Sequence, residues 1–243
     1  MKRVFILLLL MISAVITIGQ NQKQILLQEI KCRPPRFTGI EKAVPILVEE
    51  KYQTIGDYLA KNVTYPVEDL ESLVQGTEVV KFIVSSLGEI SDITIVNSVS
   101  YGIDKEVIKV LKTTNGMWKP GFNDDKPLAM EKEVSIVFKV KDMGINDFHT
   151  MAKKYYARGS EMLFNRTNLK RALTHFDKGI TLLPSDRALL VLRGLTRYQL
   201  GNRTGALNDW TRVKTLGGIE SADYLDNFSD LKGYAELTQV LGN

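Results

Sequence analysis

The sequence Trp118-Lys119-Pro120-Gly121 lies between a predicted helix and a predicted strand. The order of the elements on its two sides decides the fold. Before it, residues 78–85 and 89–99 are β-rich runs, and residues 102–113 follow a helical period. After it, Lys126-Pro127 leads into a third β-rich run at residues 132–140. Two strands, a helix and a third strand favour a helix packed across a three-stranded antiparallel sheet, a two-layer α+β domain.

The spacing of the apolar residues supports each of these elements. In the first run, Val80, Phe82 and Val84 alternate with the residues of the opposite face, which is the period of a strand. Leu87-Gly88 then predicts the turn of a hairpin. In residues 102–113 the apolar positions recur at i, i+4, i+7 and i+8, which is one face of a helix. A shorter helix is predicted at residues 54–61.

This order of helix, strand, strand, helix, Trp-Lys-Pro-Gly and strand resembles the C-terminal domain of TonB, the periplasmic protein that carries inner-membrane energy to outer-membrane transporters. The matching positions run from Tyr65-Pro66 to Lys126-Pro127, and the lead-in Pro35-Arg36-Phe37-Thr38-Gly39 extends the resemblance to residues 35–141. Asp124-Asp125 departs from the family pattern, which usually has a glycine before Lys-Pro. The resemblance implies a domain that binds protein or peptide partners and is not an enzyme.

The N-terminus predicts export. Lys2-Arg3 precede an apolar run from Val4 to Ile18, and small residues follow, as in a secretory signal. As a helix this run spans only ~22 Å, short of the ~30 Å hydrocarbon core, so a cleaved signal is favoured over an uncleaved inner-membrane anchor. We therefore predict a signal peptide at residues 1–19, a linker or lead-in at 20–50, and the TonB-like domain at 51–142.

A different pattern begins after residue 150. Ala172 and Ala206 are 34 residues apart, as are Phe176 and Trp210, at places where tetratricopeptide repeats need a small and a large residue. Residues 151–243 thus resemble a short tetratricopeptide-like domain of helical hairpins. The segment 220–241 is predicted to be helical and to cap the second repeat.

The composition and the reactive residues argue against several functions. The net charge of +4 is mild and the basic residues are scattered, so no nucleic-acid partner is expected. Cys32 is the only cysteine, and His149 and His175 are the only histidines, so no metal site, cofactor site or catalytic group is predicted. Asp124-Asp125 is interpreted as a solvated turn rather than a calcium site.

Candidate binding residues come from the expected sheet edge and from the repeats. In TonB-like domains an extended transporter peptide adds to an exposed strand, which here corresponds to Lys132, Val134, Ile136 and Phe138, with Trp118 and Pro120 nearby. For Trp118, packing in the core is the favoured alternative. In the repeats, Arg193 and Tyr198 could border a second binding surface, although ordinary repeat surface is the favoured interpretation for each.

Together these observations predict an exported periplasmic protein that binds peptides or proteins by strand addition, with TonB-dependent outer-membrane transporters as possible partners. The alternative is a structural adaptor of the envelope that binds proteins through the repeats and has no role in energy transduction. A lead-in of about thirty residues spans at most ~100 Å, and it lacks the long proline-rich rod of TonB. Membrane association is expected only through the N-terminal segment, and two copies could pair through the sheet edge.

Overall fold

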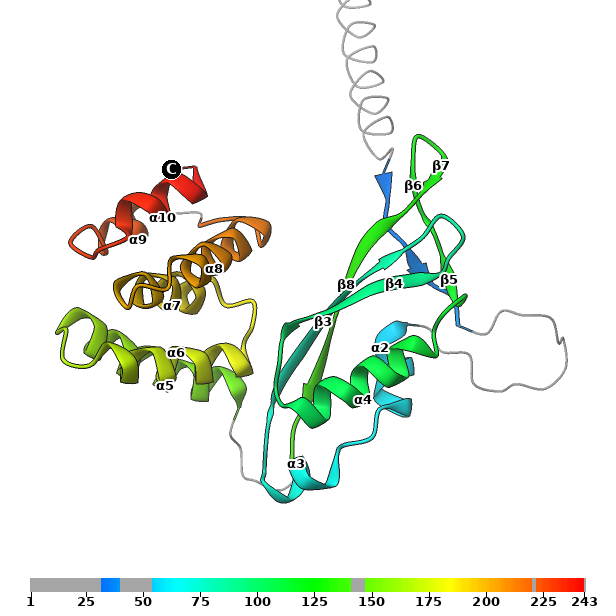
Figure 1. Ribbon diagram of the computed structural model, residues 1–243, viewed down its shortest axis with the longest axis horizontal. Helices are drawn as coiled ribbons and strands as arrows, with labels where there is room; N and C mark the ends of the chain where they lie inside the picture. Colours follow the sequence, from blue (N-terminus) through cyan, green and yellow to red (C-terminus); the bar gives the residue numbers. More distant parts are fainter. Residues whose placement is uncertain (1–31, 40–53, 141–146, 220–221, 243) are drawn as a thin grey trace, which may run out of the picture. The chain divides into compact units, whose positions relative to one another are not determined.

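The computed structural model of the chain describes residues 32–39, 54–140, 147–219 and 222–242 (Figure 1). The predicted signal peptide and most of the predicted lead-in lie outside these residues. We describe two parts separately: the sheet region, residues 32–39 and 54–140, and the helical region, residues 147–219 and 222–242. No helix of the described residues is long and apolar enough to cross a membrane.

The main sheet of the sheet region has three strands in the order β4-β3-β8. They are β3 (Gly76–Val84), β4 (Ile90–Asn97) and β8 (Met130–Phe138), and each lies within two residues of its predicted bounds. A tight turn joins β3 to β4, with the N–H of Ser85 donating to the carbonyl of Glu89 at 2.8 Å. In this turn Gly88 has a φ of +81°, and a Cβ there would meet the carbonyl oxygen of Trp118 at 2.1 Å, so the site requires glycine.

Helix α4 (Tyr101–Lys112) runs alongside this sheet (Figure 1). It begins at Ser100, whose side chain accepts the N–H of Ile103 at 3.1 Å as an N-cap. Two shorter helices precede the sheet, the predicted α2 (Ile55–Asn62) and an additional α3 (Val67–Glu71). The core is formed by apolar side chains that are at most 1% exposed, from α2, β3 and α4: Leu59, Val79, Val80, Phe82, Val84, Ile103, Val107 and Leu111.

Five short strands complete the sheet region, and none of them was predicted. β1 (Cys32–Arg33) pairs with β6 (Gly121–Asn123), which pairs with β7 (Lys126–Leu128). β2 (Arg36–Phe37) pairs with β5 (Trp118–Lys119). Part of the predicted lead-in is thus paired with the Trp-Lys-Pro-Gly segment. The β6–β7 turn is Asp124-Asp125, both with positive φ (48° and 59°), as a tight hairpin turn requires.

The helical region is a stack of helix pairs (Figure 1). Helices α5 (Phe148–Phe164) and α6 (Leu169–Leu182) form one layer, and α7 (Arg187–Gln199) and α8 (Arg203–Thr215) form the next. The repeated glycines allow the two helices of each pair to approach: a Cβ on Gly159 would lie 2.6 Å from the ring of Phe176, and one on Gly194 would lie 2.2 Å from the indole nitrogen of Trp210.

The C-terminal segment covers this stack, but the helix predicted over residues 220–241 is two short helices separated by residues 227–233. It contains α9 (Ala222–Asp226) and α10 (Tyr234–Leu241), and α10 contacts both α7 and α8. Leu225, Phe228, Leu231 and Leu237 join the apolar core that the other helices share. Gly233 begins α10 with a φ of +97°, and a Cβ there would meet the ring of Tyr198 at 2.8 Å.

Candidate partner-binding surfaces

Strand β8 forms one end of the β4-β3-β8 sheet, so β3 is its only neighbour within the described main sheet. Of the four candidate residues on β8, Val134 and Phe138 are buried, and Lys132 and Ile136 are partly buried. Phe138 packs edge-on against Tyr65, with ring centroids 5.3 Å apart. These side chains therefore hold the strand on the domain. On the opposite face of β8, Val137 is 61% exposed.

Strand β4 forms the other end of the sheet but offers a less regular edge. Asp92 near its start has a φ of +50°, in the left-handed region that interrupts regular strand geometry. No residue of β8 has a positive φ. The edge of β8 is thus extended without such a break, and it is the better template for a further strand.

Trp118 is a core residue, as favoured from the sequence. It is 5% exposed, and its ring packs edge-on against Phe37 at 5.3 Å and Phe82 at 5.1 Å. Its indole N–H donates to the hydroxyl of Thr114 at 3.1 Å. Pro120 is partly buried between β5 and β6. A ligand in contact with the Trp118 ring would have to displace Phe37 or Phe82.

Phe37 is the structural residue that the sequence reasoning did not single out. It is 6% exposed and lies opposite Trp118 in the β2–β5 pair. Next to it, the N–H and the hydroxyl of Thr38 both donate to the carbonyl of Met117, at 2.9 and 3.0 Å. Its sequence signal is that Phe37 is the only large apolar side chain in Pro35 to Gly39, which suggests a buried residue.

A buried carboxyl group lies in the middle strand. Glu78 is fully buried, and its Oε2 accepts the N–H of Val99 at 2.9 Å. Burial raises the pKa of Glu78 to about 8, and the nearby Asp104 carboxylate acts in the same direction, while the bond from Val99 opposes them. Asp104 itself accepts the hydroxyl of Ser98 at 2.9 Å. Because its pKa is shifted on folding, Glu78 makes the stability of the sheet region depend on pH.

The two candidates in the repeats have partners within the helical region. Arg193 donates to both carboxylate oxygens of Asp209, at 2.7 and 3.1 Å, and to Asp177 at 3.2 Å. Asp209 is 3% exposed, so Arg193 neutralises a buried charge. The ring of Tyr198 stacks on Trp210 at 6.0 Å, and its hydroxyl donates to Glu236. Both side chains therefore stabilise the helix stack.

The titratable groups of the described residues form no metal-binding cluster of three or more. His149 is exposed at the start of α5. His175 lies on α6 beside Tyr155, with ring centroids 6.1 Å apart. Cys32 is exposed and free.

Comparison with known proteins identifies one part of the chain. Residues 61–140 match the family model of the Gram-negative bacterial TonB protein C-terminal. The NMR solution structure of Helicobacter pylori TonB-CTD (residues 194–285) is 17% identical, covers 36% of this chain and 91% of that chain, and has a TM-score of 0.30. No curated protein matches the chain. The family match thus supports a TonB C-terminal domain within the sheet region, over residues 61–140.

Proposed function

We propose that this chain is an exported, non-enzymatic protein of the bacterial envelope that binds an extended segment of a partner protein along β8. The observation that carries this proposal is the position of β8 at the end of the β4-β3-β8 sheet. A strand edge presents unpaired N–H and C=O groups, which an extended peptide satisfies by adding as a further strand. The exposed Val137 then contributes a side-chain contact beside the backbone pairing.

The partner that fits this edge is a segment that is extended before it binds. Periplasmic segments of TonB-dependent outer-membrane transporters are our first choice, because residues 61–140 match a TonB C-terminal family. Export by cleavage before Gln20 would place the domain in the periplasm, and an intact N-terminus would instead leave an inner-membrane anchor. The same edge could pair two copies of the chain, and such a homodimer would compete with the peptide.

Disulfide trapping tests the site directly, because the exposed Cys32 is the only cysteine. In a Cys32→Ser background, Val137→Cys places a thiol on the exposed face of β8. Val96→Cys provides the matched control, because Val96 is an exposed valine (38%) on β4, the opposite end of the sheet. The probes are synthetic transporter segments with cysteine introduced at successive positions.

We expect Val137→Cys to form a mixed disulfide with alternate positions of the peptide, because side chains of an added strand point alternately to the two faces. Val96→Cys should remain unlinked. Equal trapping at both valines, or trapping without alternation, would contradict strand addition at β8. A Val137→Cys homodimer that excludes the peptide would assign the edge to self-association.

The alternative function is an envelope adaptor in which the helical region binds partners and the sheet edge has none. It is favoured by three exposed cations on α5 and α6, Arg158, Arg171 and Lys178, which form no ion pair among the described residues. If transporter segments do not bind the full chain while the helical surface retains its ligand, the adaptor function is supported and the transporter role is excluded.

A further inference from the structure

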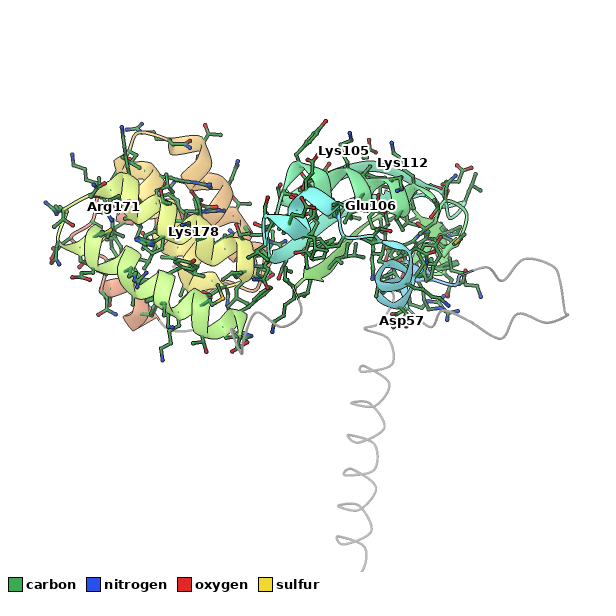
Figure 2. The ribbon with its side chains drawn as sticks, turned by 90° about the horizontal axis from the view of Figure 1, so that it is seen from below. Asp57, Lys105, Glu106, Lys112, Arg171 and Lys178 are labelled. Atoms are coloured by element: carbon green, nitrogen blue, oxygen red, sulfur yellow. The ribbon has the colours of Figure 1, made fainter. Side chains whose placement is uncertain are left out.

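The outer layer of the helical region carries a cluster of basic side chains. Arg171, His175 and Lys178 lie at i, i+4 and i+7 on α6, so they share one face of that helix. Figure 2 shows Arg171 and Lys178 on the α5–α6 layer. Tyr155 of α5 lies beside His175, and the Lys178 ammonium lies 6.0 Å from the centroid of the Tyr155 ring. Arg158, one turn further along α5, adds a third cation. We call these five residues the basic face.

The three cations of the basic face have no acidic partner among the described residues. Arg158, Arg171 and Lys178 are exposed, and none of them forms an ion pair in that part of the chain. Asp177, which precedes Lys178, instead pairs with Arg193 of α7 at 3.2 Å. Residues 148–182 contain seven Lys and Arg against two Asp and Glu. The positive charge of this layer is therefore uncompensated.

The arginines of α7, in the second layer, have hydrogen-bond partners within the helical region. Arg193 and Arg197 both donate to Asp209 of α8, and Arg187 of α7 donates to the carbonyl of Gly218 at 2.9 Å. Those side chains hold the helix stack together. In the basic face, Tyr155, His175 and Lys178 make contacts between α5 and α6, but none of the three cations forms an ion pair within the described residues that holds the helices together.

His175 shows how strongly positive this face is. Burial lowers its pKa, and the charges of Arg158, Lys178 and Arg171 lower it further. Its buried Nδ1 has no hydrogen-bond partner in the described chain. The positive charges of Arg158, Lys178 and Arg171 thus disfavour the protonated imidazole, and a bound anion would reduce their effect.

We propose that the basic face binds an acidic segment of a partner protein. Arg158 and Arg171 offer the planar guanidinium groups that bind carboxylates with two parallel hydrogen bonds. The Tyr155 ring and His175 provide an apolar surface between the cations for the stem of a Glu side chain or for a neighbouring apolar residue. This inference does not depend on peptide binding at β8.

An acidic protein segment fits better than an anionic membrane. Clusters that bind anionic lipids have roughly four to eight Lys or Arg residues near the membrane surface. The basic face has three, around a recessed tyrosine and histidine. Three cations suffice for a few carboxylates at fixed spacing, because hydrogen bonds between ionised groups are short and stronger than those between neutral groups.

The test is calorimetric titration of the full chain with an acetylated, amidated hexaglutamate peptide at low salt. We expect Arg171→Glu and Lys178→Glu each to weaken binding by roughly tenfold, and the affinity to fall as salt is added. Lys170→Glu is the matched control: it makes the same charge change on the same helix, but Lys170 does not share the Arg171–Lys178 stripe. Circular dichroism of each variant checks that the helices are intact.

A second readout locates the peptide. Bound carboxylates should raise the pKa of His175, measured by NMR titration of its imidazole signals, and Lys178→Glu should remove that shift. Equal weakening by Lys170→Glu and Lys178→Glu would overturn the proposal, as would no binding of the peptide to the unmodified chain. Binding to phosphatidylglycerol vesicles without binding to hexaglutamate would assign the face to a membrane and would also overturn it.

Discussion

At the residue scale, Glu78 makes the stability of the sheet region depend on pH. Burial and Asp104 raise its pKa from 4.5 to about 8 in the folded chain. Because the folded pKa lies above the unfolded one, the contribution to stability is complete below pH 4.5 and is lost as the pH rises through 8. We predict that Glu78→Gln, which resembles the protonated acid, flattens this dependence and stabilises the fold at pH 8 by on the order of 2 kcal/mol.

The measurement is urea unfolding at pH 5 and pH 8, followed by the indole N–H signal of Trp118, which reports on the sheet region. Glu89→Gln is the control, since Glu89 is an exposed carboxylate beside the same hairpin. It should leave the pH dependence unchanged. A Glu78→Gln variant less stable than the unmodified chain at pH 8 would contradict a raised pKa of Glu78 in the folded chain.

Gly194 tests the close approach of α7 and α8. Alanine is favoured over glycine in a helix by about 1 kcal/mol, but a Cβ here would lie 2.2 Å from the indole nitrogen of Trp210. Overpacking costs roughly 1–3 kcal/mol, so we predict that Gly194→Ala destabilises the helical region. Thermal unfolding followed by circular dichroism at 222 nm measures this loss of stability. In a Trp210→Phe background, which lacks that nitrogen, the cost should shrink; an equal cost in both backgrounds would contradict the mechanism.

At the element scale, the β2–β5 pair joins the lead-in to the sheet region through Phe37 and Trp118. We predict that Phe37→Ala loses roughly 3 kcal/mol of stability, the usual cost of removing a buried phenylalanine, and exposes the Trp118 ring. Urea unfolding and the chemical shift of the Trp118 indole signal measure both effects. Leu87→Ala, at a turn residue that is 82% exposed, should change neither. An unchanged Trp118 signal in Phe37→Ala would show that the pairing is dispensable.

The longer elements could be predicted from the sequence because their burial repeats along the chain. In β3 the buried Val80, Phe82 and Val84 alternate, and in α4 the buried residues follow the helical period. The two-residue strands β2 and β5 are too short to show a period. Their pairing depends on residues such as Thr38 and Met117, which are 79 positions apart. Such a contact becomes visible only when the chain is folded.

The candidate sites also divide into features that the sequence pattern predicts and contacts that form only in the folded chain. The third strand was predicted to form an edge of the sheet from the resembling family, and β8 does lie at one end of the β4-β3-β8 order. The partners of Arg193 did not follow from the sequence, because Asp177 and Asp209 come from two other helices and meet it only through the stacking of the layers. The basic face was also missed: Arg158 and Arg171 are ordinary surface residues in the sequence, and their lack of acidic partners is a property of the folded helix pair.

At the scale of the whole molecule, the β8 edge and the basic face recognise different chemistry. The edge pairs with backbone groups and is insensitive to side-chain charge, whereas the basic face depends on carboxylates and on salt. The groups that build each surface lie within one region, Met130–Phe138 for the edge and α5–α6 for the basic face. A partner that presents both an extended segment and an acidic segment would therefore gain affinity from their linkage.

We predict that the two surfaces bind independently when their ligands are separate. The dissociation constant of hexaglutamate should change by less than about twofold when a transporter segment saturates β8, because the edge binds backbone groups whereas the basic face binds carboxylates. Joining the two peptides by a flexible linker should strengthen binding by about 10²–10⁴, and Lys178→Glu should abolish that gain while disulfide trapping at Val137→Cys persists. A tenfold change in the separate titrations would instead reveal coupling between the regions, and a linked peptide no tighter than its halves would show that one partner cannot span both surfaces.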